Sequence, residues 1–449
     1  MNWNSRKETI RLFVGDIALF LFSLWLMLLF RYGNFPDGEL LIEHLLPFSI
    51  LFIVWILVFF IAGLYEKHTL ILRNKLPTVI LNTQAANIII AVLFFYFIPY
   101  FGITPKTNLF IYLSISFWLI FLWRLYGYSL FNTSREKQNA VLIGSGDEMK
   151  ELKQEVNNNT MYDLRFISSI DLDQIDSLDF QEDVLNLVYS ENVSVIAIDL
   201  QNEKVAPILP SLYNLIFSKI KFIDMHRIYE DIFDRVPLSL LKYSWFLENV
   251  SLSPHATYDV LKRIMDLVVS VIVGGLSLLL YPFIFIAIKL EDNGPVFFVQ
   301  ERAGKNNGVI KIVKFRSMKA HQEKDGMAKK EKVTRVGNFL RKTRLDEFPQ
   351  LWNVFVGDLS IIGPRPEIPA LVKLYEQEIP YYNIRHLIKP GLSGWAQLYQ
   401  ETPPKFTVGY GETKTKLSYD LYYIKNRSFI LDIKIGLKTL SRLLSKSGV

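Results

Sequence analysis

Four apolar segments of membrane-spanning length fill the first 131 residues, and they constrain the fold more than any other feature of the sequence. They cover residues 12–30, 45–61, 79–101 and 109–125. Each is close to the roughly 20 residues that a helix needs to cross the hydrocarbon core of a bilayer. Half of all 449 residues are apolar, which favours a membrane protein over a soluble one. We therefore expect a module of four transmembrane helices over residues 1–131.

The charges around these segments indicate their orientation. Basic residues precede the first segment, join the second to the third and follow the fourth, whereas the loop after the first holds Asp37, Glu39 and Glu43. Because Lys and Arg concentrate in cytoplasmic loops, both ends of the module are predicted to be cytoplasmic. The first segment is too long for a signal peptide and lacks a small-residue cleavage site, so it should remain as an anchor.

Two features of the composition exclude classes of function. The chain has no Cys, so disulfide frameworks and thiolate metal sites are excluded. Its net charge of +6 is explained by basic flanks that face anionic lipid and by a pocket for phosphates. We do not expect nucleic acid as a partner.

Residues 132–253 show short apolar runs that alternate with polar helical stretches, a pattern typical of βαβ units. The first run begins at Ala140, and the pattern predicts a Rossmann-like cytoplasmic domain. Gly144 and Gly146 would close a strand-to-helix turn, but Met149 stands at the third glycine position of the dinucleotide fingerprint. We therefore favour a regulatory or scaffolding domain over one that binds a nucleotide.

Residues 254–449 open with another apolar run, at 267–288, which has basic residues on both sides. A helix that enters the membrane and returns on the same side would leave both flanks in the cytoplasm. Tyr281-Pro282 would supply the break, because proline removes a backbone donor and clashes with the preceding turn. We expect a re-entrant helix at about residues 264–289, and a kinked fifth span is the alternative.

Two adjacent carboxylates, Asp346 and Glu347, lie in a dense group of unusual residues in this last section. They open an apparent helix, where acids commonly act as caps. With arginines close by in the sequence, they also suit phosphoryl transfer, in which one carboxylate attacks phosphorus and the other helps to bind a divalent cation. Mg²⁺ prefers carboxylate and phosphate oxygens, so we expect Mg²⁺ as the cofactor and both acids as its ligands.

Phosphoryl transfer also requires fixed positive charge around the phosphate oxygens. Prolines on both sides of Arg365 would hold its guanidinium in a rigid segment for bidentate contact with phosphate. Asp358 would accept a sugar or ribose hydroxyl, and Gln397 would touch a base or sugar; a turn cap and an ordinary loop are the alternatives. The predicted substrate-binding residues are Lys314, Arg316, Arg341, Arg344, Asp358, Pro364, Arg365 and Gln397.

These residues lie in motifs that resemble a known family. The bacterial sugar transferase family comprises the monotopic phosphoglycosyl transferases, also called polyprenyl glycosylphosphotransferases. The resemblance covers about residues 258–444, and the preceding parts resemble its large, WbaP-like subgroup. The motifs, in family order, are Lys314-Phe-Arg-Ser-Met, Leu345-Asp-Glu-Phe-Pro-Gln-Leu, Gly363-Pro-Arg-Pro and Lys389-Pro-Gly-Leu-Ser-Gly.

The resemblance implies an undecaprenyl-phosphate sugar-1-phosphate transferase of the bacterial inner membrane. Asp346 would attack a UDP-sugar to give a phosphosugar aspartate and UMP, and Glu347 would assist magnesium and proton handling. Undecaprenyl phosphate would then take up the sugar phosphate, which starts exopolysaccharide, capsule or O-antigen synthesis. The family also has a re-entrant helix broken by a proline, to which Pro282 corresponds, although Tyr281 stands where a small or polar residue often precedes it. The implied partners are UDP-sugar, undecaprenyl phosphate and the lipid bilayer.

Two other classes of function remain open from the residues alone. A membrane-anchored nucleotide-sugar oxidoreductase or dehydratase would use the middle domain, although the third glycine and a Tyr-x-x-x-Lys pair are missing there. A non-catalytic scaffold of polysaccharide assembly would not need Asp346. The sequence does not specify the UDP-sugar, the polysaccharide or the oligomeric state, for which a homodimer is one option.

Overall fold

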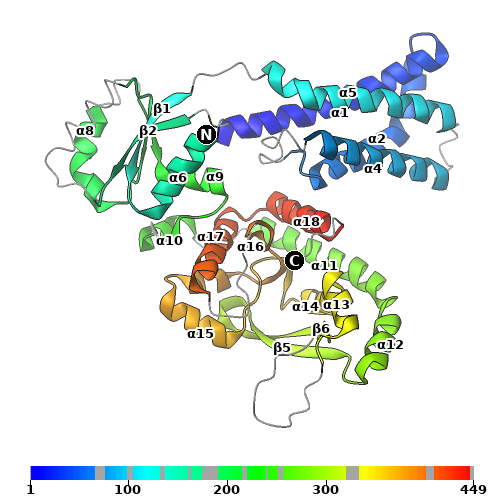
Figure 1. The fold of residues 1–449 in the computed structure, drawn as a ribbon. Helices are drawn as coiled ribbons and strands as arrows, with labels where there is room; N and C mark the ends of the chain where they lie inside the picture. The colour runs from blue at the N-terminus through cyan, green and yellow to red at the C-terminus, as the bar shows by residue number, and fades with distance from the viewer. Residues whose placement is uncertain are drawn as a thin grey trace.

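The computed structural model shows a mostly helical protein with three parts (Figure 1). The N-terminal helices run side by side, the middle part contains a parallel sheet, and the C-terminal part packs helices around short strands. The basic loop at residues 66–75, on which the predicted orientation partly rests, lies outside the described residues. The structure describes residues 2–65, 76–98, 105–131, 137–159, 162, 164–173, 191–214, 220–238, 241–250, 256–319, 333–400 and 409–444.

Within the described residues, four N-terminal helices are long and apolar enough to cross a membrane, which confirms the predicted apolar module. They are α1 (Asn2–Tyr32), α2 (Gly38–Ile61), α4 (Leu76–Phe97) and α5 (Pro105–Phe131). The helix expected at 79–101 ends at Phe97, and residues 99–104 lie outside the described part. α1 packs against α5 and α2, and α4 packs against α2 and α5 (Figure 1).

A buried polar cluster ties the first of these helices to the last. The guanidinium of Arg124, on α5, pairs with the carboxylate of Asp16, on α1, and its Nη1 donates to the Leu64 carbonyl oxygen at 2.8 Å. The Tyr65 hydroxyl donates to Asp16 Oδ2 at 2.6 Å. Ionisable residues among membrane helices are costly unless they are paired, so this cluster fixes how α1 and α5 pack.

The middle part is an α/β region whose described strands form a parallel sheet in the order β2-β1-β3-β4. Its elements are β1 (Gln138–Gly144), α6 (Gly146–Asn158), β2 (Leu164–Asp171), β3 (Val195–Ile198), a 3₁₀ turn (Glu203–Ile208), α8 (Leu209–Asn214), β4 (Lys221–Asp224) and α9 (Met225–Phe233). From Ala140 to Ile143, β1 is a continuous apolar run, as expected for a central parallel strand. Ala140 and Leu142 join one buried cluster, and Val141 and Ile143 join another. Both faces of the sheet are therefore covered.

Side chains fill the space at the glycine turn that follows β1. A Cβ at Gly144 would lie 2.8 Å from the sulfur of Met225 and 3.7 Å from the sulfur of Met149. Gly146 has a φ of +84°, which glycine adopts without steric cost. Methionine side chains therefore pack closely against Gly144, and this close packing explains the first glycine by a structural role.

The C-terminal part contains two short strand pairs: β5 pairs with β6 in antiparallel register, and β7 pairs with β8 in parallel. Its strands are β5 (Phe297–Ala303), β6 (Val309–Phe315), β7 (Ser360–Ile362) and β8 (Gly391–Ser393). Its 3₁₀ turns are Lys305–Asn307, Leu345–Glu347 and Tyr382–Leu387. Its helices are α10 (Tyr243–Asn249), α11 (Ala256–Leu278), α12 (Tyr281–Asp292), α13 (Arg335–Lys342), α14 (Gln350–Val356), α15 (Pro369–Glu378), α16 (Trp395–Tyr399), α17 (Tyr410–Asn426) and α18 (Phe429–Leu444).

The apolar run at 267–288 forms a bent pair of helices. α11 ends at Leu278, a two-residue turn follows, and α12 begins at Tyr281 with Pro282 in its first turn. The two axes differ by 56°. Proline suits the first turn of a helix, where its missing N–H would have no intrahelical partner, and it opposes continuation of the helix before it. By length and composition the pair is one broken span or a re-entrant loop.

The middle and C-terminal parts share contacts that hold them together. Val236, which follows α9, lies in a buried apolar cluster with Leu421 of α17. Lys425 Nζ, at the end of α17, lies 2.8 Å from Glu230 Oε2 of α9. The C-terminal helix α18 also contacts α2 of the apolar module (Figure 1). These contacts place all three parts against one another.

Candidate active site

The two adjacent carboxylates lie in a tight turn between α13 and α14. The Thr334 hydroxyl accepts a hydrogen bond from the Gly337 N–H at 2.8 Å and caps the start of α13. After α13 the chain reverses at Arg344, whose φ is +57°, an uncommon conformation for a residue with a side chain. Asp346 and Glu347 follow in a 3₁₀ turn. The acids therefore sit just ahead of α14 rather than in its first turn.

Glu347 is held by two cations from different segments of the chain. Arg365 Nη2, which follows β7, donates to Glu347 Oε1 at 2.9 Å, and Lys314 Nζ of β6 lies 3.7 Å from the same oxygen. Burial by itself raises the pKa of Glu347, but the charges of Arg365 and Lys314 outweigh burial and lower the pKa below its ordinary value. Glu347 is therefore ionised and fixed in place.

Asp346 is buried beside Glu347 and is not tied in this way. Its Oδ1 has no hydrogen-bond partner among the described residues. Burial, and next the charge of Glu347, raise the pKa of Asp346. The surroundings thus push the two neighbouring pKa values apart, which is how paired acids acquire different roles. A desolvated oxygen without a partner is available to attack an electrophile or to bind a cation.

Two of the arginines predicted to bind substrate lie close enough to act on Asp346. Burial raises its pKa, and the charges of Arg341 and Arg344 oppose that effect. Arg341, in the last turn of α13, donates from Nε to Ser317 Oγ at 2.8 Å, whereas Arg344 is exposed. Together with the two cations on Glu347, they surround the dyad with positive charge. Such an arrangement suits phosphoryl transfer, which depends on positioning and electrostatic stabilisation.

The positions of Arg316 and Arg302 in the fold could not be predicted from their spacing along the sequence. Arg316 is buried after β6, and its guanidinium lies where a Cβ at Gly294 would collide with it. Arg302, on β5, was not among the predicted site residues. Its Nη1 donates to the Pro366 carbonyl oxygen at 3.2 Å, and after burial it is one of the charges that lower the pKa of Lys314. The pairing of β5 with β6 and the hydrogen bonds of Arg302 and Ala303 to the carbonyl oxygens of Pro366 and Glu367 bring Arg302 to the site.

The Gly-Pro-Arg-Pro segment is positioned by the Lys-Pro-Gly-Leu-Ser-Gly segment. The Gly363 N–H donates to the Ser393 carbonyl at 2.8 Å, and the Gly391 N–H donates to the Pro364 carbonyl at 2.9 Å. A Cβ at Gly391 would collide with the backbone of Gly363, so this close approach requires glycine. Pro364 is itself buried and acts through its backbone. The second motif thus holds Arg365 in place for its contact with the dyad.

A buried charged network lies behind Arg365, and sequence reasoning missed it. Arg385 Nη2 donates to the Arg365 carbonyl oxygen at 2.9 Å. The guanidinium of Arg385 also lies 2.8 Å from Asp420 Oδ2 and 3.5 Å from Glu367 Oε1. Lys416 pairs with Glu367 as well. Burial by itself raises the pKa of Glu367, but Lys416 and Arg385 lower it to about 2. The network fixes the backbone that carries Arg365.

The contacts of Asp358 and Gln397 lie within turns and not at the dyad. Asp358 is exposed after α14, and its Oδ2 accepts a hydrogen bond from Asn353 Nδ2 at 3.4 Å. Gln397, on α16, donates from Nε2 to the Leu392 carbonyl oxygen at 3.4 Å. Of the predicted substrate-binding residues, the structure therefore groups Lys314, Arg341, Arg344 and Arg365 around the dyad.

The dyad is the metal-binding set that the sequence predicts, and its chemistry fits Mg²⁺. The described residues hold no group of three or more His, Asp or Glu side chains that could bind a metal ion. Asp346 nevertheless offers a buried carboxylate oxygen without a protein partner, next to Glu347. Mg²⁺ is usually bound by one or two carboxylates and takes its other ligands from waters and substrate phosphates. These two acids would hold such an ion together with a bound diphosphate.

Comparison with known proteins identifies the class to which this site belongs. The profile of the bacterial sugar transferase family matches residues 257–446. The exopolysaccharide production protein PSS of Rhizobium leguminosarum bv. phaseoli is 40% identical over 187 residues, which cover 39% of this chain and 91% of that protein. The chain therefore belongs to the bacterial sugar transferase family, as its motifs predicted.

Two further relatives have more specific names. The UDP-N-acetylgalactosamine-undecaprenyl-phosphate N-acetylgalactosaminephosphotransferase of Aeromonas hydrophila is 43% identical over 202 residues, or 44% of this chain and 47% of that protein. The UDP-glucose:undecaprenyl-phosphate glucose-1-phosphate transferase of Escherichia coli K12 is 42% identical over 187 residues, or 39% of this chain and 38% of that protein. The similarity thus spans less than half the length of these relatives, and their names differ in the sugar.

Proposed function

We propose that this protein transfers a sugar 1-phosphate from a UDP-sugar to undecaprenyl phosphate and releases UMP. One observation carries the proposal: Asp346 is buried with an unpartnered oxygen in the described structure, beside Glu347, which Arg365 and Lys314 hold. The names of the two relatives, which specify UDP-sugars and undecaprenyl phosphate, support the choice of substrates.

The reaction has two steps, each a displacement at phosphorus. A carboxylate oxygen of Asp346 attacks the β-phosphorus of the UDP-sugar, the bond from that phosphorus to the bridging oxygen breaks, and UMP leaves with the oxygen. A phosphate oxygen of undecaprenyl phosphate then attacks the phosphorus of the phosphosugar aspartate. The bond to Asp346 breaks, the carboxylate is restored, and the product is a lipid diphosphate sugar. Splitting the transfer in this way replaces one difficult step with two easier ones.

The residues around Asp346 have separable roles in both steps. Lys314, Arg341 and Arg344 supply fixed positive charge to the phosphate oxygens, where it stabilises the charge that develops during transfer. Glu347, held in place by Arg365, is the second carboxylate for the metal ion. Mg²⁺, when bound, neutralises phosphate charge and so makes the phosphorus easier to attack.

The proposal also covers the location of the protein in the membrane. We infer that the protein is a multi-pass protein of the bacterial inner membrane with its catalytic part on the cytoplasmic face. The four apolar helices and the bent pair α11 and α12 support this inference, and we propose that the pair is re-entrant. A UDP-sugar is soluble and undecaprenyl phosphate cannot leave the bilayer, so their phosphates meet at the interface. The α/β region, for which we propose a Rossmann-like fold on the basis of its parallel sheet, would then be cytoplasmic, and the product would start exopolysaccharide, capsule or O-antigen synthesis.

Purified protein with Mg²⁺ and undecaprenyl phosphate is expected to release UMP from one UDP-sugar in a panel of glucose, galactose and N-acetylated sugars. Pocket contacts decide between such sugars, so one donor should exceed the others clearly. The measurement is UMP formed per protein, with UDP measured in parallel. Release of UDP would indicate ordinary glycosyl transfer, and no nucleotide product from a broad panel would refute the proposed reaction.

The acid limb of UMP release is expected at a pH above the ordinary carboxyl value, because Asp346 must be ionised to attack. Burial and then Glu347 raise the pKa of Asp346 above 3.8, so protonation inactivates the site as the pH falls through that raised value. Glu347→Gln removes the neighbouring negative charge and should shift the acid limb of the remaining activity to lower pH. The rate of the first turnover, measured as a function of pH, tests this shift.

The control for this shift is Glu378→Gln, an exposed position at the end of α15, which should leave the acid limb where the wild type has it. Circular dichroism at each pH would show that every variant is folded over the range compared. An acid limb that stays in place or moves to higher pH in Glu347→Gln would contradict the assignment of the limb to Asp346.

A further inference from the structure

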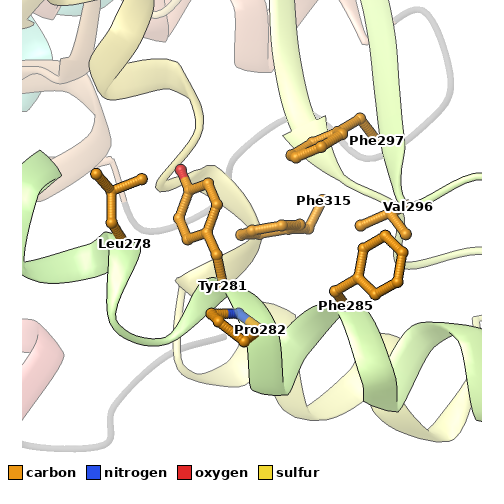
Figure 2. A pocket seen from close by; sticks show the side chains of 7 residues that line it. All are labelled: Leu278, Tyr281, Pro282, Phe285, Val296, Phe297 and Phe315. Carbon is orange, nitrogen blue, oxygen red and sulfur yellow. The ribbon is translucent and has the colours of Figure 1, made fainter.

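An apolar cavity of about 270 Å³ lies at the bend between α11 and α12 (Figure 2). Its only polar side-chain atom is the hydroxyl oxygen of Tyr281. Figure 2 shows the ring of Tyr281 beside that of Phe315, with Phe285 on the opposite side of the cavity. The ring centroids of Phe297 and Phe315 lie 5.3 Å apart in a stacked arrangement. The lining residues are Leu278, Tyr281, Pro282, Phe285, Val296, Phe297 and Phe315.

The cavity lies beside the segment that carries the catalytic carboxylates. Phe315, which lines the cavity, follows Lys314 in β6, so the two side chains point to opposite faces of the strand pair. On its own face, Lys314 Nζ lies 3.7 Å from Glu347 Oε1. Phe315 also belongs to a buried apolar cluster against which Leu345 packs, and Leu345 is bonded to Asp346 in the sequence. The cavity wall and the phosphate site are therefore made by neighbouring residues of the same two segments.

The chemistry of the lining restricts what the cavity can bind. A uridine, a sugar or a phosphate would lose its hydrogen bonds to water and gain almost none in return. An apolar cavity of about 150 Å³ takes up a molecule of the size of benzene, so this one has room for roughly two five-carbon units. The lining therefore favours a hydrocarbon chain as the ligand. Of the two proposed substrates, only the acceptor carries one, and it carries it next to a phosphate.

We propose that this cavity binds the isoprene units adjacent to the phosphate of the polyprenyl phosphate acceptor. The proposal rests on the function proposed above and names a subsite for the second substrate. With the first isoprene units between Phe285 and Phe315, the acceptor phosphate would lie towards the turn of Leu345 and Asp346, because Leu345 packs against the same apolar cluster as Phe315. The cavity thus aligns the attacking phosphate oxygen with the phosphosugar on Asp346, and general membrane association would not achieve this.

Two phenylalanines on α12 provide a matched test. Phe285 lines the cavity, whereas Phe283 does not, and both are exposed, at 49% and 71%. Phe285→Ala is expected to raise the KM for undecaprenyl phosphate about tenfold, which corresponds to losing part of one buried phenylalanine contact. The KM for the UDP-sugar should stay at the wild-type value. Phe283→Ala should change neither value, because it removes the same group from the same helix outside the cavity.

The donor half-reaction separates failure of this proposal from failure of the proposed function. Exchange of labelled UMP into the UDP-sugar needs no acceptor, so it reports an intact donor site and a folded protein. Exchange by every variant, with equal acceptor KM values for Phe285→Ala and Phe283→Ala, would overturn the cavity proposal and assign the cavity to acyl chains of the bilayer. Absence of exchange in the wild type would instead overturn the proposed function. Phe285→Leu retains an apolar side chain and should give an intermediate acceptor KM, which keeps the test valid if Phe285→Ala does not fold.

Discussion

Asp346→Asn is expected to lower the rate of UMP release about a thousandfold or more and to prevent any covalent phosphosugar adduct from forming on the protein. An amide cannot attack phosphorus, whereas its size and shape match those of the carboxylate, so the substitution removes the nucleophile and little else. The measurement combines UMP release with mass spectrometry of protein quenched after mixing with the donor alone. The wild type should gain the mass of one sugar phosphate, and the variant should gain nothing.

The matched control is Asp259→Asn, the same chemical change at an exposed position in the first turn of α11. It should keep the rate and the adduct of the wild type. If Asp346→Asn retained the adduct, the nucleophile would be another residue. If it lost the adduct but released UMP at a rate close to that of the wild type, the acceptor would attack the UDP-sugar directly and the covalent step would be wrong.

The same substitution should leave the protein at least as stable, which separates chemistry from folding. Burial, and then Glu347, raise the pKa of Asp346 in the folded state. A carboxyl group whose pKa is higher in the folded than in the unfolded protein favours the protonated form of the folded state. At neutral pH, where the group is charged, it therefore lowers the free energy of unfolding. A neutral amide in its place removes this unfavourable contribution. Thermal unfolding of Asp346→Asn at neutral pH is therefore expected at or above the temperature of the wild type.

Features that depend on neighbouring residues in the chain were predictable from the sequence. The apolar helices follow from segments long enough to cross a bilayer, and the α/β region with its parallel sheet follows from alternating apolar runs. The carboxylates Asp346 and Glu347 are adjacent, so their proximity needs no fold. Arg365 stood out because prolines restrict the backbone on both sides of it.

Features that depend on tertiary contacts were not predictable in this way. Arg302 reaches the site through the pairing of β5 with β6 and through its hydrogen bond to the Pro366 carbonyl oxygen. Arg385 lies 20 residues from Arg365 in the sequence yet donates to its carbonyl oxygen. Conversely, Asp358 stands in a dense motif, but its hydrogen bond joins it to Asn353 within its own turn. Spacing along the chain identifies candidate chemistry, and only packing decides which candidates meet.

Arg385→Met is expected to destabilise the C-terminal part by about 3–5 kcal/mol and to reduce UMP release as well. Arg385 and Asp420 are only 2% and 1% exposed, so removing the guanidinium leaves a buried carboxylate without its closest cation. The substitution also removes the donor to the Arg365 carbonyl oxygen, which loosens the segment that holds Glu347. Methionine fills a similar volume, so the effect reports charge and not a cavity. Urea unfolding followed by tryptophan fluorescence measures the loss, because Trp395 is buried in this part.

Replacing both charged residues shows whether the loss of stability in Arg385→Met comes from an unpaired buried carboxylate or from a packing defect. Arg385→Met combined with Asp420→Leu removes the ion pair completely, and an apolar pair in place of a buried ion pair is often tolerated. The double variant is therefore expected to be more stable than Arg385→Met alone, although its UMP release should stay low because Arg365 still lacks its donor. In the wild type Glu367 is ionised: Lys416 and Arg385 oppose burial and lower its pKa from 4.5 to about 2, so its contribution to stability is present above pH 4.5 and is lost only as the pH falls towards 2. Additive losses in the double variant would instead mean that the pair contributes through packing alone.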